Sequence, residues 1–476
     1  MKRLPLLAAL IMGLLSCKPG PSASPQSIFL FVMDTTRVDA VSAYGAVKGT
    51  TPATDALAAR GLRFDRAYAQ APWTLPSHAS LFTGLLPSEH GVSWRNTRAS
   101  DALEMLAERF RDAGYDTYGF SENAWISDEF NMTQGFDAFS FHGLVEGQSL
   151  PLDTVIRTWM SERTSGRPFF LFVNVVDPHW PYTVRGENPY LPEGVTAEEA
   201  RSVTQSFAHY LCRKEPRTQE LSILQGLYRG DVAAADAKLA QVLDILEGAR
   251  VSKNTVTIVT SDHGEHFGEH GLVGHEFGVH SPLVHVPLIV HGLRGTAPNV
   301  IEEPVALTDV VPSVLTWAGL DIPEGLPGRP LPTAARRNFE PRAIASEYDD
   351  PGRVGAAAES PLATWLRNWA VQQRAQCSED WPVFGDMRSL VRLPFKLIWL
   401  ERYPPELYDL AENQGEERNL AQQEPQLTAE LMAELDRVVR VAEAVRDRRA
   451  KPTPTDQPEV SEDIVESLKA LGYLED

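Results

Sequence analysis

Predominantly apolar runs of strand length are spread over the first 300 residues of the chain. They occupy residues 27–33, 168–176, 255–260 and 286–290. Runs with so little polar alternation are typical of strands buried on both faces of a parallel sheet. Residues 115–120 predict a further strand.

Helical patterns lie between these runs. Residues 52–60 and 101–113 each end at a glycine, and residues 227–246 carry leucine and valine at helical spacing. Strands that alternate with helices in this way predict an α/β sandwich with a largely parallel central sheet.

Polar side chains arrive abruptly where three of the apolar runs end. Asp34 follows the first run, Asp177 and His179 follow the second, and Asp262 and His263 follow the third. Open α/β sheets bind ligands at the carboxyl ends of their strands. These side chains are therefore expected to converge on one crevice.

The pattern changes beyond about residue 340. Residues 395–399 and 406–408 predict short strands, residues 427–444 a long charged helix, and residues 461–473 a last amphipathic helix. We therefore expect residues 28–340 to form the main domain and residues 341–476 a smaller α+β subdomain, with a Pro/Thr-rich surface linker at residues 451–457.

The first residues have the features of an export signal. Lys2 and Arg3 precede an apolar run at residues 4–15, and the ending Leu-Leu-Ser-Cys resembles a bacterial lipobox. The resemblance implies a signal peptide at residues 1–16, lipid on Cys17, and a tether at residues 17–27. We expect an exported lipoprotein of the bacterial envelope, anchored to the membrane only through this lipid; a plain secretory signal is the alternative.

The net charge limits the classes of partner that the chain can bind, and the cysteine content limits its disulfides. The 476-residue chain has a formal net charge of −20, which argues against nucleic acid as the main partner. An anionic substrate would then need local positive charge, and a metal ion could supply it. Cys212 and Cys377 allow one disulfide but do not establish it.

Residues 71–84, APWTLPSHASLFTG, carry the most distinctive candidate for chemistry. Thr74 precedes Pro76 and a plausible helix start, and the free N–H groups of a first helical turn attract anions. A hydroxyl held there is well placed to attack a phosphorus or sulfur centre. An ordinary N-cap turn is the alternative.

Histidines cluster further along. Seven of the twelve fall within residues 263–291, which suggests a metal or anion site, although His285 and His291 flank a strand and suit a structural role. Zincin spacing, a P-loop and a GxSxG motif are all missing from the sequence.

Several motifs together resemble the sulfatase family of the alkaline phosphatase superfamily. In family order they are MDTTRVD at 33–39, APWTLPSHASLFTG at 71–84, PSEHG at 87–91, DPHWPY at 177–182, TSDHGEHFGEHG at 260–271, VPLI at 286–289 and ELYDLAENQGEERNL at 406–420. The resemblance covers most of the chain. It implies an alkaline-phosphatase-like sandwich with a small C-terminal subdomain.

The resemblance also implies the site residues. It assigns one divalent metal ion to Asp34, Asp262 and His263, with the Thr74 oxygen completing the site; Ca²⁺ is the metal expected by family, and Mn²⁺ or Zn²⁺ also suit these ligands. Thr35 stands where many members have a second aspartate. His179 and His275 are implied as catalytic residues beside the anion, and Asn123, Arg37 and His78 as substrate-binding residues. For Arg37, an ion pair with Asp39 or another carboxylate is the alternative.

Thr74 departs from the family pattern. Sulfatases that use formylglycine make it from cysteine or serine in C/S-x-P-x-R, and this chain has Thr74 and His78 at the first and last positions. Threonine cannot give that aldehyde, so its ester must be cleaved by water attacking the central atom, as in phosphate-transferring relatives. The spacing of Asp177 and His179 differs from that of a second phosphodiesterase metal site and favours one metal.

These observations predict a sulfatase-type, metal-dependent hydrolase that acts on a small-molecule or glycan sulfate or phosphate ester, with Thr74 as nucleophile. A phosphodiesterase or phosphoryl-group transferase with the same site is the first alternative, although no multi-helix membrane domain of the kind common in envelope transferases is evident in the sequence. A catalytically inactive sulfatase-like binding protein is the second.

Overall fold

The structure is a computed structural model of the chain. It describes residues 25–143, 150–163, 166–186, 188–205, 218–275, 277–335, 338–340, 342–353, 361–375, 377, 383–412, 415–448 and 460–473. The predicted signal peptide, Cys17, Cys212 and the linker at 451–457 lie outside these residues, so export and lipidation stay predictions. Cys377 is disulfide-bonded.

A nine-stranded sheet forms the centre of the molecule, in the order β10-β2-β9-β6-β1-β5-β3-β4, with β11 also paired to β2. Its strands are β1 (Ser27–Met33), β2 (Leu62–Tyr68), β3 (Asp116–Ser121), β4 (Ala138–Phe141), β5 (Phe169–Val175), β6 (Thr255–Thr260), β9 (His285–His291), β10 (Asn299–Ile301) and β11 (Val305–Ala306). Every pairing is parallel except those of β9. The predicted α/β class and largely parallel sheet are confirmed.

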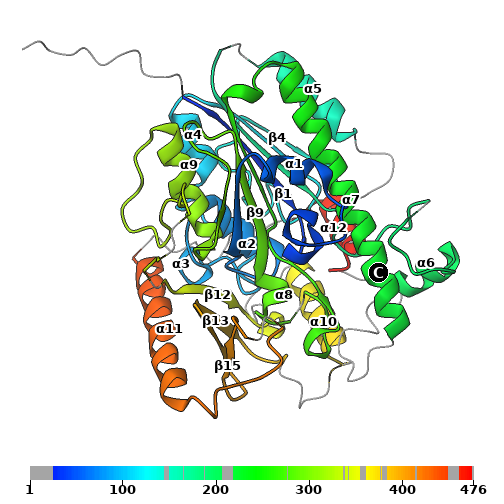
Figure 1. Ribbon diagram of the computed structural model, residues 1–476, viewed down its shortest axis with the longest axis vertical. Helices are drawn as coiled ribbons and strands as arrows, with labels where there is room; N and C mark the ends of the chain where they lie inside the picture. The colour runs from blue at the N-terminus through cyan, green and yellow to red at the C-terminus, as the bar shows by residue number, and fades with distance from the viewer. Residues whose placement is uncertain are drawn as a thin grey trace, which may run out of the picture.

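Helices cover both faces of this sheet (Figure 1). Helices α2 (Thr74–Thr83), α4 (Leu106–Asp112) and α9 (Val310–Ala318) pack on one face, and α1 (Pro52–Ala58), α5 (Leu152–Glu162) and α7 (Thr218–Gly248) on the other. The side chains of β1 alternate between these two cores: Leu30 enters the first and Phe31 the second, both fully buried. This double burial explains why β1 is a continuous apolar run.

Two helix boundaries differ from the sequence prediction. Helix α4 begins at Leu106 rather than near residue 101, because the Asp101 carboxylate accepts a hydrogen bond from Asn131 and the Met105 N–H is satisfied by Glu108. Helix α7 begins near residue 218, ahead of the predicted 227–246, and its first turns bury Ile223 and Leu224 in a separate small core.

The C-terminal part contains a four-stranded antiparallel sheet, β12-β13-β14-β15 (Figure 1). Its strands are β12 (Ile344–Tyr348), β13 (Met387–Arg392), β14 (Phe395–Leu400) and β15 (Glu406–Asp409). Helix α11 (Pro425–Arg446) covers one face of this sheet through Leu431, Leu435 and Val439. Helix α12 (Glu462–Ala470) instead packs into the hydrophobic core of the nine-stranded sheet.

The other helices are α3 (Pro87–His90), α6 (Ala197–Gln205), α8 (Ser281–Val284) and α10 (Pro361–Ala375), and β7 (His266–Phe267) forms a hairpin with β8 (Val273–Gly274). In the described part of the chain, no helix has the length and apolar content that crossing a membrane requires.

A buried ion pair of the C-terminal part contacts helix α8, which directly precedes β9 of the large sheet. Lys396 of β14 lies 2.7 Å from the carboxylate of Glu416, and neither side chain is exposed. The Glu416 carboxylate also accepts hydrogen bonds from the N–H and hydroxyl of Ser281, at the start of α8. Burial alone would raise the pKa of Glu416, but the charge of Lys396 and these donors lower it to about 2.

Lys396→Met is therefore expected to destabilise the protein by about 3–5 kcal/mol, since it leaves Glu416 buried without its counter-ion. Arg440→Met is the matched control, because the Arg440–Asp436 pair is exposed and should contribute about 1 kcal/mol or less. Thermal unfolding of the two variants measures the difference. Equal, small losses would show that the buried pair does not stabilise the fold more than an exposed pair does.

Candidate active site and metal centre

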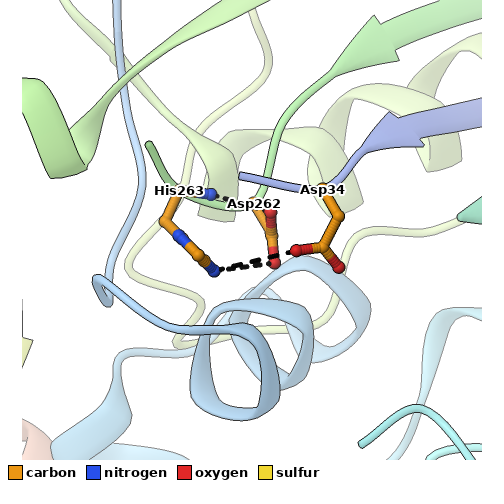
Figure 2. Close-up of side chains that lie close together, drawn as sticks. All are labelled: Asp34, Asp262 and His263. Atoms are coloured by element: carbon orange, nitrogen blue, oxygen red, sulfur yellow. Dashed lines mark hydrogen bonds and ion pairs between the residues drawn. The ribbon is translucent and has the colours of Figure 1, made fainter. Parts of the chain in front are cut away.

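The three predicted metal ligands meet at the carboxyl end of the large sheet. Asp34 follows β1, and Asp262 and His263 follow β6. Because β1 and β6 are adjacent and parallel, their ends lie side by side, and the three side chains point toward one another (Figure 2). Residues separated by more than 220 positions are thereby brought into one cluster.

The donor atoms of this cluster suit a divalent cation. One ligand atom from each residue lies within 4.8 Å of the others, and all three side chains are fully buried. His263 Nε2 is 3.4 Å from Asp262 Oδ2, and neither atom has a hydrogen-bond partner among the described residues. Burial and the nearby charge of Asp34 raise the pKa of Asp262 well above its ordinary value. A bound cation would be coordinated by the two unpaired atoms, and its charge would reduce the repulsion between the two carboxylates.

Thr35 holds these ligands in place. Its N–H donates to Asp262 Oδ1 at 3.0 Å, and its hydroxyl donates to Asp34 Oδ1 at 2.9 Å. Its backbone has φ +58°, a strained value for a β-branched residue. Strain of this kind persists where the surroundings fix the backbone, as at many functional sites. At the position where many family members have a second aspartate, this chain thus has a threonine whose side chain is hydrogen-bonded to Asp34.

Thr74 lies at the same cluster. Asn123 Nδ2 donates to Thr74 Oγ1 at 3.2 Å and to Asp34 Oδ2 at 2.9 Å, so one amide joins the hydroxyl to a metal ligand. Helix α2 begins at Thr74 itself, so Thr74 is part of the helix that the sequence suggested would follow it. Thr74 is consequently in the first turn, where backbone N–H groups have no partner within the helix and favour negative charge.

His179 and His275 lie next to the cluster from two other loops. Their ring centroids are 4.9 Å apart, and the ring of His275 is 4.6 Å from that of His263. Burial, and then His275, lower the pKa of His179, while His275 Nδ1 is 3.1 Å from Glu265 Oε1. The structure thus brings together the proposed metal ligands, Thr74, Asn123 and both histidines.

The other two predicted substrate-binding residues contact groups of the protein. The Arg37 guanidinium pairs with Asp39 and Glu269, each at 2.7 Å, in agreement with the ion-pair alternative. His78 is fully buried; its Nδ1 contacts the Thr74 carbonyl at 2.9 Å and lies 3.4 Å from Asp262 Oδ2. Substrate contact by Arg37 and His78 stays a prediction.

Asp177 belongs to a separate charge network. Its carboxylate lies 2.5 Å from Lys238 Nζ and 2.9 Å from the guanidinium of Arg185. Among the described residues, only Asp34, Asp262 and His263 bring three such ligand atoms within 4.8 Å of one another. The number of metal ions stays a prediction.

Sequence reasoning did not identify three further side chains at the site. Asn174 Nδ2 donates to Asp34 Oδ2 at 3.1 Å, Glu265 contacts His275, and the hydroxyl of Tyr473 lies 3.2 Å from His275 Nε2. Asn174 is the one polar residue inside an apolar strand, a signal that was available. Tyr473 lies in the C-terminal tail and had no recognisable pattern.

Four of the five remaining histidines of the 263–291 segment divide into two groups, and His291 is the last residue of β9. His266, His270 and His280 pack together toward the C-terminal sheet, with His270 and His280 stacked at 3.8 Å. His285 hydrogen bonds the carbonyl of Asp65 and stacks on Tyr68, as its predicted structural role requires.

Comparison with known proteins identifies the family of the chain. The model of the sulfatase family matches residues 26–320, which is more than half of the chain. The chain belongs to the sulfatase family. It is accordingly an ester-bond hydrolase of that family, whose members are generally metal-dependent.

Curated sulfatases are similar over most of their length. The uncharacterized sulfatase YidJ of Escherichia coli is 25% identical over 370 residues, covering 67% of this chain and 73% of the relative. The Delta 4,5-hexuronate-2-O-sulfatase of Bacteroides thetaiotaomicron is 22% identical over 463 residues, covering 86% and 88%.

Solved sulfatase-like structures share the fold. The phosphonate monoester hydrolase of Agrobacterium radiobacter has a TM-score of 0.66 at 22% identity, covering 88% of this chain and 96% of its own. A 2-O GAG sulfatase has a TM-score of 0.67 at 20% identity, covering 91% and 96%. Sulfatase-family architecture is thus found both in enzymes named for sulfate esters and in one named for phosphonate esters.

Proposed function

We propose that this chain hydrolyses an ester of sulfuric acid, or of a related phosphorus oxyacid, through a covalent intermediate on Thr74. The observation that carries the proposal is the Asn123 amide, which joins Thr74 Oγ1 and Asp34 Oδ2 through hydrogen bonds of 3.2 and 2.9 Å. The candidate nucleophile therefore lies against the candidate metal ligands in a fully buried site.

Asp34, Asp262 and His263 would hold one divalent cation. Two carboxylates and an imidazole suit Ca²⁺, Mn²⁺ or Zn²⁺, and Ca²⁺ is the metal expected by family. When bound, the cation supplies positive charge that favours ionisation of a neighbouring hydroxyl and stabilises negative charge on the ester.

In the first step of the proposed reaction, each of these protein residues has a separate role. Thr74 Oγ1 loses its proton and attacks the sulfur or phosphorus atom, while the bond from that atom to the leaving alcohol breaks. The Asn123 amide orients Thr74, and the first turn of α2 stabilises the oxygens of the ester. The neutral imidazole of His179 or His275 takes up the Thr74 proton and transfers it to the leaving oxygen.

Water completes the cycle by attacking the central atom of the threonine ester, which releases the acid anion and restores the hydroxyl. A formylglycine hydrate could instead expel sulfate by collapsing to an aldehyde, and threonine lacks that route. This chemical difference favours phosphorus esters as the second candidate substrate, in particular phosphonate monoesters and phosphodiesters.

The charge of the site favours a singly charged ester. Two carboxylates offset a divalent cation, and burial lowers the pKa values of His179 and His263, so both imidazoles are neutral at pH 7. In the part of the chain that the structure describes, no lysine or arginine is paired with Asp34, Thr74, Asp262 or His263. A monoanion therefore matches this site better than a dianion.

A substrate panel tests these points. Aryl sulfate, phosphonate monoester, phosphodiester and phosphate monoester would be assayed at pH 8 with Ca²⁺, Mn²⁺ or Zn²⁺, together with a sulfated disaccharide because one relative is named for a hexuronate sulfate. We expect kcat/KM for the dianionic phosphate monoester to be at least about tenfold below that of the best monoanion. A preference for the dianion would contradict the charge argument, and no turnover of any ester would contradict the proposed function.

A further inference from the structure

The C-terminal tail returns to the candidate active site. Helix α12 ends at Ala470 and is followed by Leu471, Gly472 and Tyr473, and the Tyr473 N–H donates to the Leu468 carbonyl at 2.9 Å. Gly472 has φ +77°, and a Cβ atom there would lie 1.9 Å from the ring of Trp180. Only glycine allows this turn, which directs the tyrosine side chain inward.

The Tyr473 hydroxyl lies between the two candidate catalytic histidines. It is 3.3 Å from His179 Nε2 and 3.2 Å from His275 Nε2, and the residue is only 3% exposed. His179 Nδ1 contacts the carbonyl of Trp180, so Nδ1 carries the proton and Nε2 accepts the hydrogen bond from the tyrosine. A hydroxyl can rotate to donate to another acceptor, whereas the imidazole nitrogens are fixed by their partners.

The tyrosine ring is held on several sides. Its centroid is 5.5 Å from Trp125, 6.0 Å from Trp369 and 6.2 Å from Trp94. Leu468 and Leu471, on the same tail, are buried in the core of the large sheet. Removing the tail would expose this apolar surface, so the tail is an integral part of the site rather than a plug that substrate displaces.

We propose that Tyr473 contacts the substrate: its hydroxyl donates a hydrogen bond to an oxygen of the ester held beside His179 and His275. This inference rests on the proposed function in placing an oxyanion ester at those histidines. It adds a third hydrogen-bonding group, from the opposite end of the chain, to a site whose other members come from residues 34–275.

Tyr473→Phe tests the inference because it removes the hydroxyl and keeps the packed ring. Tyr115→Phe is the matched control: Tyr115 is 2% exposed, and its hydroxyl donates to the carbonyl of Gln26, away from the site. We expect Tyr473→Phe to lower kcat/KM, and the affinity for inorganic sulfate or phosphate measured by calorimetry, by about 10- to 100-fold, the usual effect of losing a hydrogen bond to a charged group. The control should stay within about twofold, and both variants should keep the wild-type melting temperature to within a few degrees.

Unchanged kcat/KM and anion affinity in Tyr473→Phe would overturn the inference, since Tyr473 would then be only part of the wall. Increased activity would also overturn it and would identify the hydroxyl as an inhibitor of binding. If the wild type hydrolyses no ester, the proposed function fails, but the anion affinities of the two proteins still decide the role of Tyr473. Failure of both proteins to bind either anion would contradict the inference itself.

Discussion

Thr74→Ala is expected to lower kcat by about 10³- to 10⁶-fold, the range seen when a covalent nucleophile is removed. The change deletes the atom that would form the bond to sulfur or phosphorus, while the Asn123 amide keeps its hydrogen bond to Asp34. Metal content and melting temperature should therefore stay close to wild type. Steady-state kinetics, elemental analysis and thermal unfolding measure the three quantities.

Two control variants make this result specific. Thr83→Ala removes a buried hydroxyl from the same helix, where it donates to the carbonyl of Ala79, and should leave kcat unchanged to within a few-fold. Thr74→Ser keeps the hydroxyl and should retain much of the activity. If Thr74→Ala turned over substrate at the wild-type rate, Thr74 could not be the nucleophile, and a water molecule would have to attack the ester directly.

The architecture could be predicted because burial dictates the composition of the central strands. β1, β5 and β6 lie inside the sheet with helices on both faces, so their residues had to be apolar throughout. The strand β2 was missed although it is also internal, because it alternates, and Arg63 and Asp65 pair with each other on its polar side. Hydropathy also carries no information on direction, which is why antiparallel β9 could not be distinguished from its parallel neighbours.

The metal-ligand cluster could be predicted for a related reason. Asp34, Asp262 and His263 follow buried strands, and parallel strands deliver such residues to one edge. Tyr473 could not be predicted in this way, since its position depends on how the last helix packs against the large sheet. Neither the turn at Gly472 nor the contact with His179 leaves a periodic signal in the sequence.

Asp262→Asn is expected to abolish stoichiometric metal binding and to lower kcat/KM by at least about a hundredfold. Asparagine keeps the oxygen that accepts hydrogen bonds from the Thr35 and His263 N–H groups, but it removes one of two buried negative charges. The metal-free variant should therefore be more stable than the metal-free wild type, since Asp34 and Asp262 no longer repel each other. Metal analysis and thermal unfolding with and without a chelator measure both effects.

Unfolding experiments with added metal distinguish the loss of a metal ligand in Asp262→Asn from a general loss of structure. At a metal concentration about a hundredfold above Kd, binding should stabilise the wild type by about 2.7 kcal/mol, and Asp262→Asn should show no such shift. Asp236→Asn is the matched control: this carboxylate is also buried, but it accepts hydrogen bonds from Ala53 and Thr54 at the start of α1 and should leave metal content unchanged. Full metal occupancy in Asp262→Asn would show that Asp262 is not a metal ligand. Metal binding would then no longer explain why the carboxylates of Asp34 and Asp262 are both buried at the end of this sheet.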